Sequence, residues 1–359
     1  HFMLKEIFEA PEVLENAMRG RLILGEGRAK LGGLESVKSE LMNVDRLIIV
    51  ACGTAYYAGL VGEYLIEDLA GIPVEVELAS EFRYRKPIIG KNTAIIAISQ
   101  SGETLDTLEA VREAKRRGAI TLGIVNTVGS TIARETDAGV YNHAGPEMGV
   151  ASTKAFLSQI AVLALIGLFF GRNRTMSDAE GKKFIASLQK LPDLANKVLA
   201  QSDAIKAIAH KYLYARDFLY MGRRYSYPMA MEGALKLKEI SYVHAEGFGA
   251  GEMKHVPIAM IYDKFPTMVI VPEDSVYEKT LSNMIEIRAR KGPIIALATE
   301  GDQRVKEVAQ DVISIPKVEE LLTPVLSAIA LQLFAYHFAA EKGLNVDRPR
   351  NLAKSVTVE

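Results

Sequence analysis

Three hydroxyl groups and an amide cluster where an apolar run ends, at Ser99-Gln100-Ser101-Gly102-Glu103-Thr104. The segment lies between an expected strand, 93–99, and an expected helix, 104–117. Backbone N–H groups and the helix dipole at such a junction attract phosphate, and hydroxyl groups add donors without adding charge. Helix capping by Ser101 or Thr104 is the alternative, but a cap needs one such residue and not a cluster. The segment therefore predicts a phosphate-binding turn.

Two further segments could contribute chemistry. Residues 145–154 combine glycines, a glutamate and hydroxyl groups before an apolar run, which fits either a capped turn or a ligand-binding loop. Glu232, Lys236 and Glu239 share one face of an expected helix. A solvated face with salt bridges is one interpretation. The other is a partly buried carboxylate beside a lysine, which is what proton transfer from carbon requires.

His255 lies in a glycine-rich loop, 246–257, and Lys354 in a polar tail, 347–359. A single loop histidine is more often structural or solvated than catalytic, and chain ends are usually frayed. The six histidines show no ligand spacing, so no metal site is expected. Composition alone therefore assigns no chemistry to either residue.

Strand-like apolar runs alternate with helix-like segments along the whole chain, as in parallel α/β folds. The expected strands are 46–51, 93–99 and 120–125, followed in the same order by 217–221, 267–271 and 294–297. The expected helices pair in the same way: 57–69 with 229–240, 104–117 with 280–290, and 153–170 with 323–340. Repetition in one order indicates a duplicated domain.

This pattern predicts the domain organisation. It consists of a helical lead-in (1–43), a first domain (44–175), a helical linker (176–211), a second domain (212–341) and a tail (342–359). Ligands of parallel sheets bind beyond the carboxyl ends of the strands. The turn after Ser99 is therefore the first place where a ligand is expected.

Composition excludes several classes of function. Hydrophobic residues make up 49% and charged residues 24%, and the net charge of −1 offers no electrostatic footprint for nucleic acid or an anionic membrane. The apolar runs 160–170 and 321–340 are short or interrupted and are expected to be core helices. The single cysteine, Cys52, is expected to be a structural thiol in the cytoplasm. Because the chain starts with His1 and not with Met, we expect a fragment.

On these residues the chain resembles the isomerase half of the glutamine–fructose-6-phosphate aminotransferase (glucosamine-6-phosphate synthase) family. The matching segments are CGT (52–54), SQSGET (99–104), GVASTKAF (149–156), EGALKLKEISY (232–242) and PRNLAKSVTVE (349–359). SQSGET alone occurs in many sugar isomerase (SIS) domains, whereas the last two segments are narrower. The resemblance implies an α/β fold of two tandem SIS domains, each a flavodoxin-like or Rossmann-like parallel sheet flanked by helices, with a catalytic C-terminal tail.

The resemblance also implies a role for individual residues. The phosphate would be bound by Ser99, Gln100, Ser101 and Thr104, and the sugar by Thr54, Val150 and Ser152. Glu239 would move a proton between C1 and C2 with Lys236 beside it, and Lys354 would form a Schiff base with the ketose. His255 would open and close the sugar ring in the partner subunit's site, which implies a homodimer. The tail amine, the acid and the phosphate turn are expected to meet over one sugar.

The implied substrate is fructose 6-phosphate, converted with ammonia to glucosamine 6-phosphate or isomerised to glucose 6-phosphate, without a metal or organic cofactor. The family's glutaminase domain would precede residue 1, so this chain is expected not to hydrolyse glutamine. Two alternatives stay open: a fructosamine-phosphate deglycase or amino-sugar-phosphate deaminase, and a non-catalytic sugar-phosphate sensor. Ala55 and Val256 depart from the family's usual serine and glycine, which bears on one substrate contact and on the His255 loop.

Overall fold

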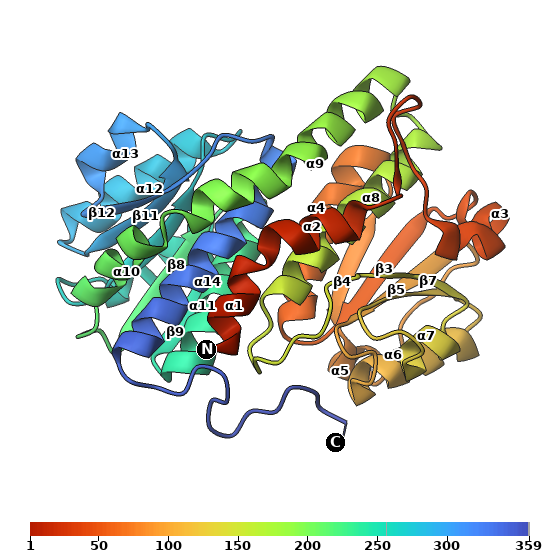
Figure 1. The fold of residues 1–359 in the computed structure, drawn as a ribbon, viewed down its shortest axis with the longest axis horizontal. Coiled ribbons are helices and arrows are strands. Elements are labelled where there is room, and N and C mark those ends of the chain that lie inside the picture. Colours follow the sequence, from red (N-terminus) through yellow and green to blue (C-terminus); the bar gives the residue numbers. More distant parts are fainter. Residues whose placement is uncertain (256, 358–359) are drawn as a thin grey trace. The chain divides into compact units, whose positions relative to one another are not determined.

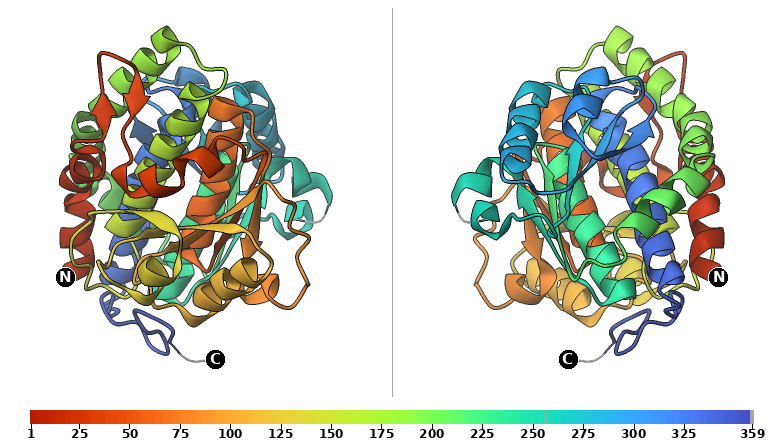
Figure 2. Two further views of the ribbon diagram at one scale, coloured as in Figure 1. Left: turned by 90° about the vertical axis from the view of Figure 1, so that its right-hand side faces the viewer. Right: turned by 90° about the vertical axis from the view of Figure 1, so that its left-hand side faces the viewer.

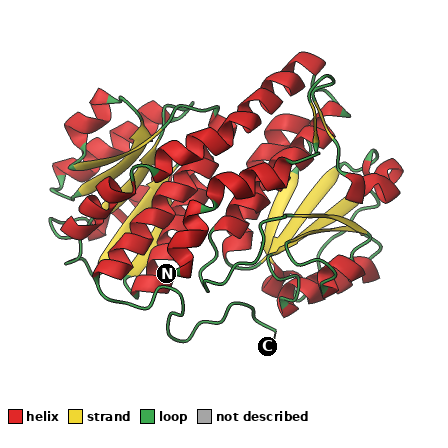
Figure 3. Cartoon of the chain, in the orientation of Figure 1, coloured by secondary structure: helices red, strands yellow, loops and turns green. Residues whose placement is uncertain are grey.

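The chain divides into two compact units in the computed structural model, which describes residues 1–255 and 257–357. Unit 1 comprises His1–Pro11, Met148–Thr153 and Lys190–Leu352, and unit 2 comprises Glu12–Glu147, Lys154–Gln189 and Ala353–Glu359. Each unit contains a parallel sheet, drawn in yellow between red helices in Figure 3. Val256, whose expected effect concerns the His255 loop, lies outside the described residues.

Unit 2 is built on a sheet of five strands in the order β4-β3-β5-β6-β7. The strands are β3 (Arg46–Ala51), β4 (Val74–Leu78), β5 (Thr93–Ser99), β6 (Ile120–Val125) and β7 (Ala138–Tyr141), all paired in parallel. The helices that follow them are α4 (Thr54–Ala70), α5 (Ala79–Phe82), α6 (Leu105–Arg116), α7 (Thr131–Glu135) and α8 (Lys154–Arg172).

Alternation of side chains along the strands gives this sheet two apolar faces. Ile48, Val50 and Ile95 form one buried cluster with side chains of α5 and α6. The opposite face contacts α4, where Gly59 lies so close to Ile49 and Val76 that a Cβ atom would come within 3.0 Å of each side chain. Helices therefore cover both faces, as Figures 1 and 2 show.

Unit 1 repeats this architecture with the strand order β12-β11-β10-β8-β9. Its strands are β8 (Asp217–Gly222), β9 (His244–Gly249), β10 (Thr267–Val271), β11 (Ile294–Thr299) and β12 (Asp311–Ile315). Its helices are α10 (Ser202–Lys211), α11 (Ser226–Ser241), η2 (Ala250–His255), η3 (Pro257–Met260), α12 (Tyr277–Ala289), α13 (Gln303–Val308), η4 (Glu320–Leu322) and α14 (Thr323–Glu341). The rings of Phe218, Phe334 and Phe338 pack together where α14 meets the sheet.

The two sheets have one topology, because β4-β3-β5-β6-β7 and β9-β8-β10-β11-β12 describe the same connection of five strands. The duplication predicted from the sequence is therefore confirmed. Three helices begin earlier than predicted: α4 at Thr54, α11 at Ser226 and α12 at Tyr277. In the first case Gly53 adopts a positive φ of 56°, which starts the helix directly after the strand.

The remaining elements belong to the lead-in and the linker. They are α1 (Phe2–Phe8), α2 (Ala10–Met18), β1 (Leu22–Ile23), β2 (Arg28–Ala29), η1 (Gly32–Val37), α3 (Lys38–Leu41) and α9 (Asp178–Leu199). Among the described residues, two helices are long and apolar enough to cross a membrane, Lys154–Arg172 and Glu320–Glu341, but 100% and 94% of their apolar windows are buried. Both are core helices, as the sequence predicted.

Glu63 on α4 predicts a pH-dependent stability. Burial, reinforced by Glu67 and Glu75, raises the pKa of Glu63 from 4.5 to about 7. A raised acid pKa means that the ionised form destabilises the fold, so this penalty is absent at pH 4 and grows as the pH rises through 7. Glu63→Gln is therefore expected to increase the unfolding free energy at pH 8 by about 1 kcal/mol after solvent screening. Denaturant titrations at pH 4 and pH 8 check this, and an equal effect at both values would contradict it.

Candidate active site

The predicted phosphate turn lies at the switch point of the unit 2 sheet, where the chain leaves β3 and β5 in opposite directions. Ala51 pairs with Ile98, so the segments that follow these strands, 52–54 and 99–104, start next to each other. Thr107 of α6 donates a hydrogen bond to the Cys52 sulfur at 3.9 Å. Burial raises the pKa of the Cys52 thiol, which fits the predicted structural role. Ligands of parallel sheets bind at the carboxyl ends of the strands beside such a switch point.

The turn is organised by its own hydroxyl groups. Ser99 is buried, and its Oγ lies 3.0 Å from Thr104 Oγ1 and accepts the N–H of Gly102 at 3.0 Å. Ser101 Oγ accepts the N–H of Glu103 at 3.1 Å. Thr104 is the N-cap residue of α6 but forms no side-chain cap hydrogen bond. Of the two caps considered as the alternative to phosphate binding, Thr104 therefore forms none, whereas Ser101 satisfies a backbone N–H directly before α6.

The loop after β6 forms hydrogen bonds with the 99–104 turn. The N–H of Asn126 bonds to the Gln100 carbonyl at 3.1 Å, and the N–H of Thr131 bonds to the Glu103 carboxylate at 2.7 Å. Gly102 has a φ of 67°, and a Cβ atom there would lie 2.0 Å from Ser130 Oγ. Only glycine satisfies both conditions, so this conformation of the turn requires glycine at position 102.

Residues of the C-terminal tail that belong to unit 2 contact this turn. The N–H of Leu105, at the start of α6, donates to the Val356 carbonyl at 3.2 Å. Two residues earlier, Lys354 Nζ lies 2.5 Å from Glu147 Oε2, and the Glu147 side chain is fully buried. The other carboxylate oxygen of Glu147 accepts the N–H of Ala155 at 3.1 Å. The predicted Schiff-base lysine is thus held by a buried acid in the same unit as the phosphate turn.

Glu147 is a candidate functional residue that the sequence did not single out. It lies in the 145–154 segment, where a turn and a ligand loop could not be distinguished. The one feature of the sequence that could have indicated a functional role for Glu147 was an acidic residue inside a loop of small residues. A buried carboxylate beside an amine can take up the proton that a lysine must lose before it acts as a nucleophile.

In unit 1, α11 carries three ionisable side chains that are closely associated. Lys236 Nζ lies 2.6 Å from Glu239 Oε2 and 3.6 Å from Glu232 Oε1. The side chains of Lys236 and Glu232 are 1% exposed, and that of Glu239 is 23% exposed. The interpretation as a solvated face is therefore wrong, because α11 packs on β8, β9 and α14 and buries this face. The lysine holds the accessible carboxylate in place, as a proton-transferring acid needs.

The other predicted residues of unit 1 lie at its surface or in its 148–153 segment. His255 is exposed at the end of η2. Val150 and Ser152 are half-buried, and the Ser152 hydroxyl is itself buried without a hydrogen-bond partner among the described residues. A buried hydroxyl of this kind is a suitable donor to a ligand.

The second sheet has its own cavity at the position that corresponds to the phosphate turn. A cavity of about 460 Å³ lies next to the ends of β10 and β11 and is lined by Glu273, Asp274, Tyr277, Gly301, Asp302, Gln303 and Arg304. Burial raises the pKa of Asp274 to about 6, and Tyr277 donates to Asp302 at 2.7 Å. Carboxylates repel phosphate, so the duplicated position does not repeat the chemistry of the 99–104 turn.

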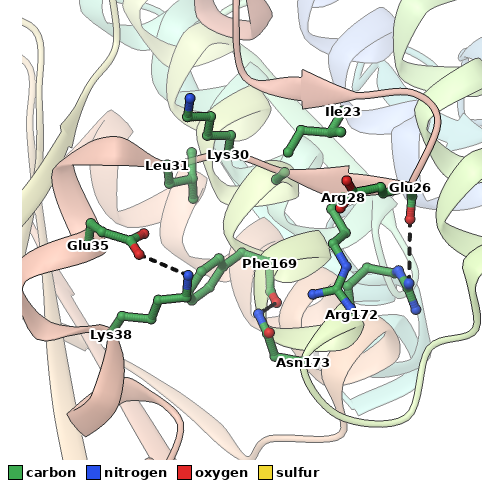
Figure 4. Close-up of a pocket in the computed structure, with 11 residues that line it drawn as sticks. Ile23, Glu26, Arg28, Lys30, Leu31, Glu35, Lys38, Phe169, Arg172 and Asn173 are labelled. Carbon is green, nitrogen blue, oxygen red and sulfur yellow. Dashed lines mark hydrogen bonds and ion pairs between the residues drawn. The ribbon is translucent and has the colours of Figure 1, made fainter.

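A further cavity of unit 2, of about 210 Å³, lies among the lead-in hairpin β1–β2, η1 and the end of α8 (Figure 4). Arg172 donates to the Glu26 carbonyl at 3.4 Å, and Lys38 pairs with Glu35 at 3.0 Å. None of its lining residues belongs to the segments predicted to carry chemistry. This cavity is therefore separate from the candidate site residues.

The family model of the SIS domain matches residues 40–168 and 212–342 of this chain. The chain therefore belongs to the SIS-domain family, in agreement with its fold and with the segments described above. The chain is 55% identical over its full length to a glutamine–fructose-6-phosphate aminotransferase [isomerizing] of Chlorobaculum tepidum, and 52% identical to one of Thermus thermophilus. It spans 58% and 59% of the length of these relatives.

Solved structures agree with this assignment. The C-terminal domain of glucosamine-fructose-6-phosphate aminotransferase from Francisella tularensis is 38% identical, with a TM-score of 0.91 over 97% of this chain and 98% of that domain. A glucosamine-6-phosphate deaminase from Thermotoga maritima, 20% identical with a TM-score of 0.78 over 99% of each chain, shares the fold. The predicted family and the two tandem SIS domains are confirmed.

Proposed function

We propose that this chain is the isomerase part of an enzyme that converts fructose 6-phosphate and ammonia to glucosamine 6-phosphate and water. The observation that carries the proposal is the ion pair of Lys354 with the buried Glu147, in the unit that contains the 99–104 turn. The N–H of Leu105 also bonds to the tail at Val356. The similarity to aminotransferases of this type supports the choice of substrate.

The first half of the proposed reaction belongs to Lys354. Glu147 accepts a proton from its ammonium group, and the free amine attacks C2 of the open-chain ketose. Loss of water gives an imine between C2 and Nζ. Ammonia then adds to C2 and the lysine amine leaves, so that nitrogen from ammonia is bound to C2 and Lys354 is regenerated.

The second half belongs to Glu239. The C2 imine, formed with Lys354 or with ammonia, acidifies the C1 protons, and the Glu239 carboxylate removes one of them to form an enaminol. Return of this proton to C2, with transfer of the C1 hydroxyl proton to the nitrogen through solvent, gives an aldehyde at C1 and an amine at C2, which is glucosamine 6-phosphate. Lys236, 2.6 Å from Glu239, keeps the carboxylate oriented through both transfers.

Two further parts of the proposal concern the assembly and its location. The exposed position of His255 suits a role in the site of a partner subunit, so we propose a homodimer. Sedimentation of the purified chain as a monomer at micromolar concentration would exclude this. We also propose the cytoplasm, where the free thiol of Cys52 would remain reduced, and cell fractionation tests the location.

Proton exchange tests the proposed activity. Fructose 6-phosphate incubated with the chain in D₂O is expected to lose ¹H signal at C1, and added ammonium chloride is expected to yield glucosamine 6-phosphate by mass spectrometry. Binding without exchange would indicate a sensor. Release of ammonia from glucosamine 6-phosphate without any synthesis would indicate a deaminase, and either result would reject the proposal.

A further inference from the structure

The N-terminus of α1 is held by a carboxylate near the start of the C-terminal tail. The N–H groups of Phe2 and Met3 donate to the two oxygens of Asp347 at 2.9 and 2.8 Å. His1 Nδ1 lies 2.9 Å from the Tyr336 hydroxyl of α14. A carboxylate at a helix N-terminus forms charge-assisted hydrogen bonds and is favoured by the helix dipole. This end of α1 is therefore fixed to the segment after α14.

The same helix holds the 148–150 segment through a second carboxylate. Glu6 is 3% exposed, and its oxygens accept the N–H of Met148 and the N–H of Gly149, the latter at 3.2 and 3.3 Å. A Cβ atom on Gly149 would lie 2.9 Å from Glu6 Oε2 and 3.6 Å from Met3 Cα. A side chain at position 149 would therefore have to displace the Glu6 carboxylate.

A third contact joins the same segment to the backbone of Asp347. The N–H of Val150 donates to the backbone carbonyl of Asp347 at 3.1 Å. Three successive N–H groups, those of Met148, Gly149 and Val150, are therefore bound either by Glu6 or by Asp347, whose own carboxylate caps α1. All these residues belong to unit 1.

We propose that Glu6 and Asp347 are positioning residues for the sugar site, acting through the 148–152 segment. Val150 and Ser152 are the predicted sugar contacts of this segment, and the Ser152 hydroxyl is buried without a hydrogen-bond partner among the described residues. The assignment of a sugar to this segment rests on the proposed function. The statement that α1 and the start of the tail hold the segment in place rests only on the hydrogen bonds given above.

Isosteric substitutions test this proposal. Glu6→Gln places an amide donor against backbone N–H groups, and Asp347→Asn does the same at the start of α1. Hydrogen exchange of the amides of residues 148–150, measured without sugar, is expected to accelerate at least about tenfold in both variants. The KM for fructose 6-phosphate in C1 proton exchange is expected to rise about tenfold, with kcat changed less than about threefold.

A matched control lies on the same helix. The Lys5 side chain is 73% exposed and pairs with Glu9 at 3.2 Å, so Lys5→Gln should change neither the exchange nor KM. Unchanged exchange in both Glu6→Gln and Asp347→Asn would overturn the proposal, as would faster exchange with an unchanged KM. If the unmodified chain does not turn over fructose 6-phosphate, the proposed function fails, while amide exchange still decides whether these carboxylates hold the segment. If Glu6→Gln does not fold, Asp347→Asn, at a half-buried residue, decides alone.

Discussion

Lys354→Arg is expected to lower the rate of C1 proton exchange by about a thousandfold or more while the fold keeps its stability. Arginine retains a positive charge opposite the buried Glu147 but does not lose its proton, so it cannot form an imine with the ketose. Removal of a covalent nucleophile leaves only binding and general acid–base contributions. The readouts are ¹H NMR of fructose 6-phosphate in D₂O and the mass of the protein after borohydride treatment in the presence of the sugar.

The result separates the enzyme from a sensor. The unmodified chain is expected to gain the mass of one reduced sugar phosphate, and Lys354→Arg is expected to gain none. Lys317→Arg is the matched control, because its side chain is 75% exposed and lies in an ion pair with Glu273. Full turnover by Lys354→Arg would contradict the Schiff base. Tight binding of fructose 6-phosphate by both proteins, with turnover by neither, would identify a sensor.

Glu239→Gln is expected to lower C1 exchange by about 10² to 10⁴-fold, the usual contribution of a positioned general base. Glutamine occupies the same volume, and its amide oxygen can accept a hydrogen bond from Lys236, but it cannot carry a proton between C1 and C2. Formation of the imine belongs to Lys354 and should survive. Borohydride trapping is therefore expected to remain while exchange is lost, and the two assays on one variant separate the two steps.

The matched control for this variant is Glu300→Gln, an exposed glutamate outside every predicted site segment. It should leave both assays unchanged. Loss of trapping together with exchange in Glu239→Gln would mean that Glu239 serves the binding of the sugar or the imine step. Exchange at the unmodified rate would mean that another group transfers the proton.

The sequence by itself determined the central strands and the position of the turn at 99–104. The bounds predicted for β3, β5, β6 and β10 are those observed, because buried parallel strands are continuous apolar runs bounded by turn residues. The 99–104 segment stood out because its hydroxyl groups are adjacent in the chain, and the duplication because each half repeats the same order. These signals lie in short stretches of the chain, so they can be recognised without a three-dimensional structure.

Strands with exposed or irregular patterns needed the tertiary structure. In β4, Val74–Leu78, apolar residues alternate with two glutamates over only five residues and the burial is irregular, and β9 contains two glycines within His244–Gly249. The alternation in β4 is a short strand signal, yet β4 is absent from the strands predicted above, whereas β9 has no pattern that distinguishes a strand from a loop in isolation. Pairing of β4 with β3 and of β9 with β8 supplies the hydrogen bonds that make each of them a strand.

The partners of the charged side chains were also decided only by the fold. Glu147 meets Lys354 across 207 positions of the chain, and Glu6 meets Gly149 across 143. The spacing of Glu232, Lys236 and Glu239 placed them on one helix face, yet a face is solvated or buried according to what packs against it. The physical reason is common to all three cases: burial and ion pairing depend on contacts between distant segments, which one sequence does not record.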